Sequence, residues 1–296
     1  MFKAVERINQ SIENQTKRLY LGFCDLEELP KELASLVYLE ELSLQYNKKL
    51  KNLSLLAELR NLISLDISDS QVKDLDPLSS LRNLTSLSIN NTQIEDLSPL
   101  SKLENLTSLS FSYTLVTDLT PLAQLTNLTT LSFNNTQVTD LNALSNLSKL
   151  TSLVINHTQV KDLSPIVRLR RLTTIDLNNT QVSDLSSLML LDNLAELYVY
   201  NTQVGDLTHL AKLIKLRKLN VSNTQVYDLK PLAQLTNLIE FYGYNTQVSD
   251  LSVLAQLSKL MKLYISNTQA KSLSPLTKLQ NLTELYISNT DRKSVV

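Results

Sequence analysis

The sequence predicts an α/β solenoid, a coil of about twelve short turns that each contribute one strand to a parallel sheet. The triplet Asn-Thr-Gln recurs along the chain, and its threonines are always separated by a multiple of 22 residues. Apolar residues recur at fixed places within each turn, with a spacing that fits neither a long helix nor a simple alternating strand. Self-similarity of this period is typical of repeat proteins whose turns stack on one another.

One column of equivalent residues sets the register of the turns. It contains the triplet threonines and continues through Ser70, Asn47 and Cys24 toward the N-terminus. Counted from this column, apolar residues recur at positions 2, 5, 8, 11, 14, 17 and 19, and positions 5, 11 and 14 are leucine in all ten regular turns. Positions 17 and 19 alternate with polar residues, as in a short strand. Because one turn buries too little to offset the cost of ordering its backbone, the turns are expected to stack into one array.

Two polar columns are expected to satisfy backbone groups where the chain bends. The column residue follows the strand, where buried N–H and C=O groups need partners, so Cys24 and its equivalents are interpreted as structural. Aspartates four positions later, from Asp74 to Asp250, are interpreted as capping residues rather than a cation site. Proline at position 7 suits a first helical turn. His157 and His209 lie in different columns, so no metal site is predicted.

The N-terminal segment differs from the repeats. Residues 1–17 carry Phe2, Val5, Ile8 and Ile12 at helical spacing, which predicts an amphipathic helix that caps the first leucine layer, with a partner-binding helix as the alternative. The solenoid is expected to span residues 18–296 in about 12–13 turns, with an uncapped C-terminal end.

Composition argues against several classes of function. The net charge of −1 speaks against a dedicated nucleic-acid binder. No stretch reaches the roughly 18 apolar residues of a membrane helix, and no secretory signal is visible, which favours a cytoplasmic location. The chain has three glycines, too few for glycine-rich phosphate loops, and one cysteine, which excludes an internal disulfide. We therefore expect no catalytic activity and no cofactor.

The leucine spacing resembles that of the leucine-rich-repeat family over roughly residues 19–290. The 22-residue form, with segments such as Asp96-Leu97-Ser98-Pro99-Leu100, is similar to the bacterial internalin type. This resemblance implies a right-handed coil with a parallel sheet on its concave side and mostly 3₁₀ or extended segments on its convex side. The first two turns, around Leu26 to Leu33, are similar to repeats of Roco-type and other intracellular bacterial proteins, which usually continue into another domain. The residues that carry the spacing are Leu39, Leu42, Leu44 and Asn47, and again Leu84, Leu87, Ile89 and Thr92.

The outward-facing strand residues change between the two halves of the chain. They are expected 6, 4, 2 and 1 positions before the column residue, and in the first half they are small, as in Ser86, Ser88, Asn90 and Asn91. In the second half, tyrosines and charges of alternating sign replace them. The residues predicted to bind a partner are Tyr198, Tyr200, Tyr242, Tyr244, Tyr264, Tyr286, Glu196, Lys218, Glu240, Lys262 and Glu284.

These residue types favour a protein-binding site, because tyrosine is enriched at binding hot spots and charged residues suit the rim around them. Other interpretations stay open. The tyrosines could pack only on each other, and the charges could form a ladder that satisfies itself. The site could also lie around Tyr113 and Leu115, where the triplet pattern breaks.

The sequence thus predicts a non-catalytic module that recognises a protein partner on its concave face. One alternative is a regulatory fragment of a larger multidomain protein such as a Roco-type GTPase. Another is a glycan-binding surface, because Tyr, Asn and Asp also suit sugars. Inside the core, Gly243 is the one non-apolar residue at position 19, and the ring of Phe241 is predicted to fill the space that it leaves.

Overall fold

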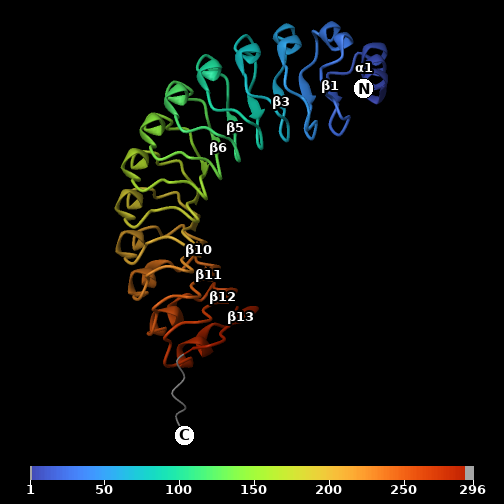
Figure 1. The fold of residues 1–296 in the computed structure, drawn as a ribbon. Coiled ribbons are helices and arrows are strands. Elements are labelled where there is room, and N and C mark those ends of the chain that lie inside the picture. The colour runs from blue at the N-terminus through green and yellow to red at the C-terminus, as the bar shows by residue number, and fades with distance from the viewer. Residues whose placement is uncertain (1, 291–296) are drawn as a thin grey trace. The chain divides into compact units, whose positions relative to one another are not determined.

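The computed structural model describes residues 2–290, and the chain divides into two compact units, Met1–Leu150 and Thr151–Val296. Each unit repeats one design, in which a three-residue strand lies on one side and a short 3₁₀ helix on the other (Figure 1). The strands of each unit are parallel and follow one another in chain order. Within the described residues, thirteen strands and twelve 3₁₀ helices confirm the predicted fold class.

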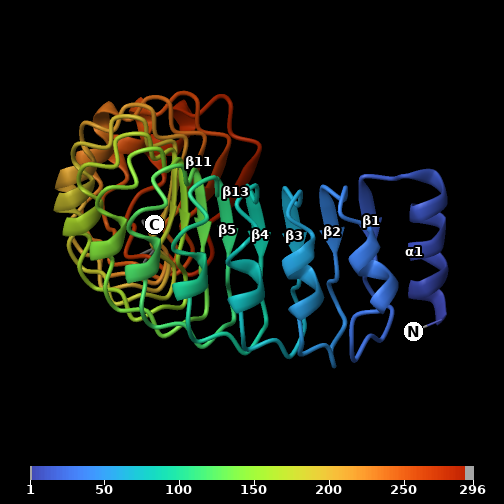
Figure 2. The ribbon, with the colours of Figure 1, turned by 90° about the horizontal axis from the view of Figure 1, so that it is seen from above.

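The first unit begins with helix α1 (Phe2–Asn14), which contacts the first strand and the first 3₁₀ helix. Figure 2 shows this helix beside β1, with β1 to β5 side by side. The strands are β1 (Arg18–Tyr20), β2 (Glu41–Ser43), β3 (Ser64–Asp66), β4 (Ser86–Ser88), β5 (Ser108–Ser110) and β6 (Thr130–Ser132). The 3₁₀ helices are η1 (Lys31–Ser35), η2 (Ser54–Glu58), η3 (Asp76–Leu78), η4 (Ser98–Leu100), η5 (Thr120–Leu122) and η6 (Asn142–Leu144).

The second unit continues the same alternation. Its strands are β7 (Ser152–Val154), β8 (Thr174–Asp176), β9 (Glu196–Tyr198), β10 (Lys218–Asn220), β11 (Glu240–Tyr242), β12 (Lys262–Tyr264) and β13 (Glu284–Tyr286). Its 3₁₀ helices are η7 (Ser164–Ile166), η8 (Ser186–Leu188), η9 (Thr208–Leu210), η10 (Lys230–Gln234), η11 (Ser252–Gln256) and η12 (Ser274–Lys278).

Equivalent residues of neighbouring turns lie directly beside one another. In β4 and β5, Leu87 pairs with Leu109 and Ser88 pairs with Ser110, so the buried leucines form one row and the outward serines another. The middle residue of each strand points into the core because successive side chains alternate between the two faces. A 22-residue repeat without insertions therefore converts each sequence column into a row on the structure.

The column residues satisfy backbone groups at the bends, as predicted. The hydroxyl of Thr136 donates to the carbonyl of Phe133 at 2.9 Å, and the column threonines from Thr92 to Thr268 make the same bond. Asn47 is fully buried and links two turns. Its Oδ1 accepts from the N–H groups of Cys24 and Leu26, at 3.2 and 3.0 Å, while its Nδ2 donates to two carbonyls. Cys24 is buried, and its sulfur lies 3.6 Å from Nη1 of Arg7.

One predicted position is wrong. The residue before the column residue was expected on the outward face of the strand, but it lies in the bend with a left-handed backbone: φ is 51° at Asn91 and 53° at Asn135. Consecutive residues cannot share one face of a strand, and asparagine tolerates positive φ better than most residues. The asparagine of the repeated triplet is therefore a turn residue.

The aspartate column accepts the first backbone N–H of the 3₁₀ helices from η3 to η11, which confirms the prediction of a capping or turn residue. Oδ1 of Asp96 accepts the backbone N–H of Ser98 at 2.7 Å, and the equivalent bond recurs from Asp74 to Asp250. The side-chain and backbone hydrogen bonds from Ser98 lower the pKa of Asp96. The prolines at position 7 occupy the first helical turn, where a backbone donor is not needed.

The buried face of helix α1 agrees with the predicted one at Ile8 and partly at Val5, but not at Phe2 and Ile12. Ala4, Ile8 and Ser11 are buried, whereas Phe2 is 87% exposed and Ile12 is 40% exposed. Small residues allow the helix backbone to approach the first turn closely, so the larger side chains at its edges remain in solvent. At the other end of the described chain, Leu285 is 41% exposed, although its equivalents in earlier strands are buried.

The core prediction for Gly243 is confirmed. A Cβ atom on Gly243 would come within 2.9 Å of Cζ and 3.0 Å of Cε1 of Phe241, so the phenyl ring occupies the space where other turns carry a branched side chain. Both residues are buried. The larger side chain of Phe241 and the missing side chain of Gly243 therefore compensate for each other in volume.

Candidate functional site

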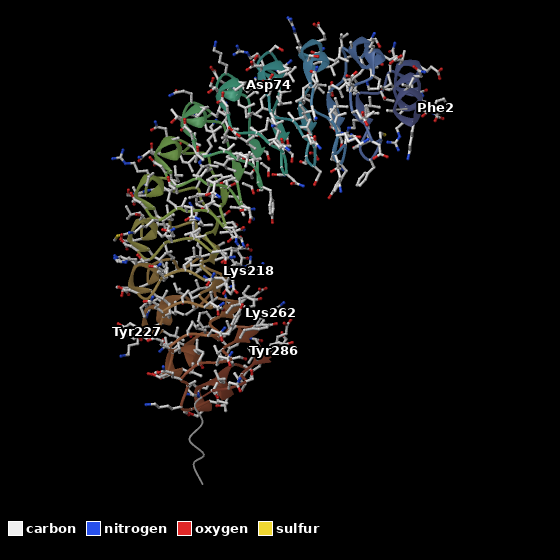
Figure 3. The ribbon with its side chains drawn as sticks, viewed as in Figure 1. Phe2, Asp74, Lys218, Tyr227, Lys262 and Tyr286 are labelled. Carbon is white, nitrogen blue, oxygen red and sulfur yellow. The ribbon has the colours of Figure 1, made fainter. Side chains whose placement is uncertain are left out.

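Five adjacent strands of the second unit bring the predicted binding residues together. From β9 to β13 the first residue of each strand alternates in sign, and the pairing places Lys218 between Glu196 and Glu240. The third strand residues form a second row, in which Tyr242, Tyr264 and Tyr286 are direct neighbours. In Figure 3, Lys218, Lys262 and Tyr286 lie on the strand side of this unit, whereas Tyr227 lies on the opposite side. We call this surface the tyrosine face; it comprises Tyr198, Tyr200, Tyr242, Tyr244, Tyr264, Tyr286, Glu196, Lys218, Glu240, Lys262 and Glu284.

The tyrosine rings contact one another. The ring centroids of Tyr242 and Tyr264 are 4.8 Å apart, those of Tyr264 and Tyr286 are 4.4 Å apart, and the latter pair is stacked. Tyr286, on the last strand, is 56% exposed, and the other tyrosines of the face are partly buried. Mutual packing, one of the two interpretations of these residues, is thus present. The ring contacts form two groups, Tyr242 with Tyr264 and Tyr286, and Tyr200 with Tyr244.

Glutamates of the same face hold the phenol groups. The hydroxyl of Tyr198 donates to Glu196 at 3.0 Å, that of Tyr242 donates to Glu240 at 2.9 Å, and that of Tyr264 crosses to Glu284 at 2.7 Å. The hydrogen bond to Glu284 raises the pKa of Tyr264 to about 12. The pKa of Tyr198 is also raised, chiefly by burial and then by Glu196. Each bonded phenol is neutral and fixed in orientation.

The charged row is only partly paired within itself. Lys218 forms an ion pair with Glu196 at 3.1 Å, and Lys262 forms one with Glu284 at 3.2 Å. Among the described residues, Glu240 makes no ion pair within 4.0 Å, and its carboxylate accepts the hydroxyl of Tyr242 instead. Glu284 serves both Lys262 and Tyr264, which lowers its pKa. The row is therefore a network of charges and phenols rather than a simple ladder of ion pairs.

A buried hydroxyl lies beneath two of the tyrosines. Ser222 occupies the position between Tyr200 and Tyr244, because Asn201 donates its N–H to the Ser222 carbonyl and Asn223 donates to that of Tyr244. The rings of Tyr200 and Tyr244 meet above this position, with centroids 6.1 Å apart. Ser222 is fully buried, and its Oγ has no hydrogen-bond partner. An unpaired buried hydroxyl is costly, so this position is not optimised for the isolated fold.

Other exposed aromatic residues lie outside this face. Tyr113 is 61% exposed and Leu115 is 52% exposed, so the alternative site has the exposure that it requires. The sequence reasoning missed a stacked pair, Phe23 and Tyr46, whose ring centroids are 4.4 Å apart. Both residues have a positive φ in the position that usually carries asparagine. Bulky residues in that column were the available signal, because the left-handed region disfavours them.

The first half of the chain is less uniform than expected. Tyr20 of β1 is 62% exposed, and Arg18 pairs with Glu41 of β2 at 3.0 Å. From β3 to β8 the third strand residues are small or acidic, namely Asp66, Ser88, Ser110, Ser132, Val154 and Asp176. The change to tyrosine therefore begins at β9.

The part of the chain that the structure describes holds neither a cluster of metal-binding side chains nor a membrane-spanning helix. Residues 2–290 contain no group of three or more His, Cys, Asp or Glu side chains arranged to hold a metal ion. Within the same range, no helix has the length and apolar character needed to cross a membrane.

Comparison with known proteins agrees with the repeat geometry. The family model for Leucine Rich repeats (2 copies) matches residues 60–102, 104–146 and 148–188. The structure is similar to an internalin of Listeria monocytogenes, InlF, with 26% identity and a TM-score of 0.81 over 94% of this chain and 93% of that one. No curated protein matches the chain in sequence.

Two further solved structures share the fold. A leucine-rich-repeat protein of Leptospira interrogans has 20% identity and a TM-score of 0.77, over 97% of this chain and 88% of that one. A plant peptide hormone receptor, RGFR1, has 19% identity and a TM-score of 0.74, over 88% of this chain and 45% of that one. Residues 60–188 thus carry matched leucine-rich repeats, and with the column spacing and the parallel strands with 3₁₀ helices the chain is similar to bacterial internalin-like leucine-rich-repeat proteins.

Proposed function

We propose that the chain is a recognition module whose tyrosine face binds a protein partner. Proteins of this repeat family generally mediate protein–protein interactions, and the plant receptor RGFR1, which shares the fold, has been solved in complex with RGF2. The proposal rests on a difference between the core columns and the outward columns of the second unit. The core columns stay leucine through the second unit, whereas the outward columns change to tyrosine and charge from β9 onward.

The tyrosine face has the physical properties of a binding surface. Three of its six phenol groups, those of Tyr198, Tyr242 and Tyr264, are already bonded to glutamates, so these side chains have less entropy to lose on association. Tyrosine presents rigid area that is both apolar and polar, which suits hot spots. The partly exposed Lys218–Glu196 and Lys262–Glu284 pairs flank the aromatic row and would form a polar rim.

The folded chain does not need this surface for its own stability. The strands from β3 to β6 have the same register with serine, threonine or aspartate at the outward positions. The buried Ser222 hydroxyl beneath Tyr200 and Tyr244 also favours binding, because separation of the rings by a partner would give that group access to a hydrogen bond. Mutual packing of the tyrosines and partner binding are therefore compatible.

The test is recovery of the partner followed by measured affinities. A pull-down with the full chain identifies candidates, and dissociation constants are then compared for Tyr242→Ala, Tyr244→Ala, Ser88→Ala and Ser132→Ala. We expect the tyrosine variants to lose about 2 kcal/mol or more, roughly thirtyfold in affinity, and the serine variants to lose little. Retained affinity in the tyrosine variants, with loss in Tyr113→Ala or Leu115→Ala, would place the site in the first unit. Binding of a glycan alone would contradict the protein-partner proposal.

A further inference from the structure

A second departure from the repeat adjoins the tyrosine face. The residue seven positions before the column residue is threonine in several turns, and its hydroxyl bonds the carbonyl of the equivalent residue one turn earlier. The bond from Thr107 to Thr85 is 3.1 Å long, and that from Thr283 to Met261 has the same length. From β9 to β12 this threonine is replaced in four consecutive turns by Ala195, Arg217, Ile239 and Met261. None of these four side chains carries the hydroxyl group that makes this hydrogen bond in the other turns.

The replacements line a groove at the N-terminal ends of the strands. One part of about 500 Å³ is lined by residues that include Ala195, Lys215 and Arg217, and the adjoining part by residues that include Met261. The two parts adjoin at Ile239 and Lys259, which line both. Met261 is 42% exposed. We call this feature the basic groove; its apolar floor is Ala195, Ile239 and Met261, and its cations are Lys215, Arg217 and Lys259.

Among the described residues, the cations of the basic groove form no ion pair with a carboxylate. No acidic residue is among those that line it. The ammonium groups of Lys215 and Lys259 each donate to a neutral amide oxygen at 2.7 Å, those of Asn193 and Asn237. Within residues 2–290, Arg217 forms no ion pair within 4.0 Å. Three positive charges thus surround an apolar floor without internal compensation.

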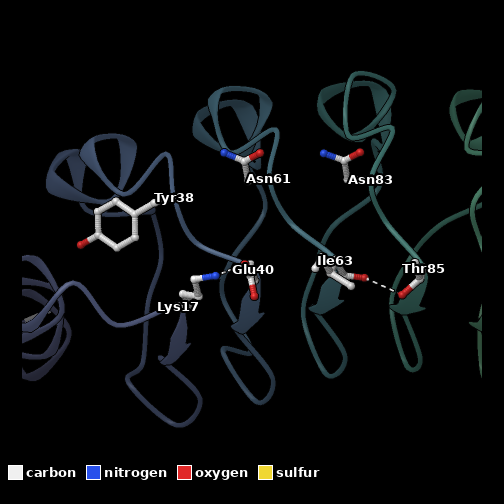
Figure 4. Close-up of a pocket in the computed structure, with 7 residues that line it drawn as sticks. All are labelled: Lys17, Tyr38, Glu40, Asn61, Ile63, Asn83 and Thr85. Atoms are coloured by element: carbon white, nitrogen blue, oxygen red, sulfur yellow. Dashed lines mark hydrogen bonds and ion pairs between the residues drawn. The ribbon is translucent and has the colours of Figure 1, made fainter.

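The equivalent position in the first unit is different. The hollow shown in Figure 4 is lined by residues that include Lys17, Ile63 and Thr85. There the ammonium group of Lys17 is paired with Glu40 at 2.6 Å, and the hydroxyl of Thr85 still bonds the carbonyl of Ile63. A groove at this edge of the repeats therefore does not require unpaired cations. What distinguishes the turns beside the tyrosine face is the combination of Arg217 and two lysines with apolar residues in the threonine row.

We infer that the basic groove binds an extended acidic segment of the protein partner, with carboxylates at Lys215, Arg217 and Lys259 and apolar side chains on Ile239 and Met261. This inference rests on the proposed function and names the chemistry of the partner. Charge complementarity requires an anion, and a guanidinium such as that of Arg217 binds a carboxylate through two parallel hydrogen bonds. The apolar floor requires aliphatic side chains beside it.

A nucleic-acid strand fits the same surface less well. Every nucleotide of such a strand carries a phosphate charge, whereas the cations of the groove are interleaved with apolar side chains such as Ile239. An extended peptide can place charge at intervals. Lys215 and Lys259 are equivalent residues two turns apart, which corresponds to roughly 10 Å, or about three residues of an extended chain. In a polyproline II segment, which rises about 3.1 Å per residue and returns to the same face every third residue, acidic residues three positions apart would meet both lysines.

The test uses defined peptides and the full chain. The probe is a fluorescently labelled peptide of four Glu-Leu-Ser triplets, compared with peptides that carry Gln or Lys in place of Glu. We expect the Glu peptide to bind, the Gln peptide to bind at least about tenfold more weakly, and the Lys peptide to bind more weakly still. The affinity of the Glu peptide should fall as salt is added, because partly exposed charges are screened.

A matched pair of variants locates the site. Lys215→Glu with Lys259→Glu should weaken the Glu peptide by about tenfold or more. Lys149→Glu is the control, because Lys149 lies in the same column and donates to Asn127 at 2.6 Å but lies outside the groove. It should change the affinity by less than about twofold. Circular dichroism spectra of the variants verify that the fold is retained.

Several results would overturn the inference. These are no binding of the Glu peptide, equal binding of the Glu and Gln peptides, equal effects of the groove variants and Lys149→Glu, or tighter binding of a twelve-nucleotide single-stranded DNA than of the Glu peptide. If any of these results is found while Tyr242→Ala still reduces the affinity for the partner, the acidic-segment inference is refuted and the proposed function of the tyrosine face stands. The expected peptide results, with partner affinity unchanged by Tyr242→Ala and Tyr244→Ala, support the groove and refute the tyrosine face.

Discussion

The pair formed by Phe241 and Gly243 permits a quantitative test of how the core is packed. Neighbouring turns carry leucine and a branched residue at these two positions, as in Leu219 with Val221. In the turn of β11 the larger ring replaces leucine, and glycine makes room for it, since a Cβ on Gly243 would lie 2.9 Å from Cζ of Phe241. Each residue should therefore be unfavourable without the other.

The two single substitutions should both destabilise the chain, for opposite reasons. Phe241→Leu leaves the space above Gly243 unfilled, and the resulting cavity should cost on the order of 1–3 kcal/mol. Gly243→Val places a side chain where the ring lies, and overpacking should cost about 1–3 kcal/mol. The double variant restores the pattern of the neighbouring turns. Its free energy of unfolding should lie within about 1 kcal/mol of the wild-type value, which implies a coupling energy of about 2 kcal/mol or more.

Urea unfolding followed by circular dichroism measures this coupling. The midpoints and slopes of the four proteins are compared, and equal slopes show that the same structure unfolds in each case. If the destabilisation of the double variant equals the sum of the two single effects, the residues do not share one space and the packing argument is refuted.

Three further predictions concern the bends and caps of the repeat. Asn47→Ala removes hydrogen bonds to Cys24, Leu26, Leu21 and Leu44 and should lower the free energy of unfolding by about 3 kcal/mol or more. Thr136→Val removes one bond and should lower it by about 1 kcal/mol. Equal losses for the two variants in chemical unfolding would contradict this. Ser222→Ala removes an unpaired buried hydroxyl and should leave stability unchanged or raise it by up to about 1 kcal/mol. Ser112→Ala, in the same column, loses the bond from the Asn134 N–H at 3.0 Å and should lower the stability. A clear loss of stability in Ser222→Ala would show that its hydroxyl has a partner. Capping lowers the folded-state pKa of Asp96 and Asp118 below the usual 3.8, so their stabilisation is complete above that pH and is lost as the pH falls through the lower folded-state values. Asp96→Asn with Asp118→Asn keeps a capping oxygen without a charge and should make the acid dependence of the melting temperature shallower; an unchanged dependence would refute the assignment.

The repeat could be predicted because each column has one dominant physical role. Leucine at positions 5, 11 and 14 specifies the buried layer whatever its neighbours are, and the hydroxyl of Thr136 or the carboxylate of Asp96 acts on backbone groups close in sequence. The compensation between Phe241 and Gly243 was also predictable, because both departures lie two residues apart on one strand.

Features that depend on several elements could not be read from the columns. The exposure of Phe2 and Ile12 depends on how closely helix α1 approaches the first turn, which helical spacing alone does not determine. The partial burial of the tyrosines depends on ring contacts between strands, such as that of Tyr200 with Tyr244 across an intervening serine. The basic groove depends on which residues of successive turns meet at one edge, so Arg217 was not selected from sequence.

The central claim is that the departure of the outward columns from the repeat creates the binding surface. The most direct test returns one strand to the residues found in β6, with Glu240→Thr, Tyr242→Ser and Tyr244→Asn combined in one variant. The control carries Thr130→Ala, Ser132→Ala and Asn134→Ala in the first unit. The measurement is the dissociation constant for the partner, after circular dichroism has verified that both variants are folded. The β11 variant is predicted to bind at least about thirtyfold more weakly, and the control to bind within about threefold of wild type. Wild-type affinity in the folded β11 variant would contradict the claim.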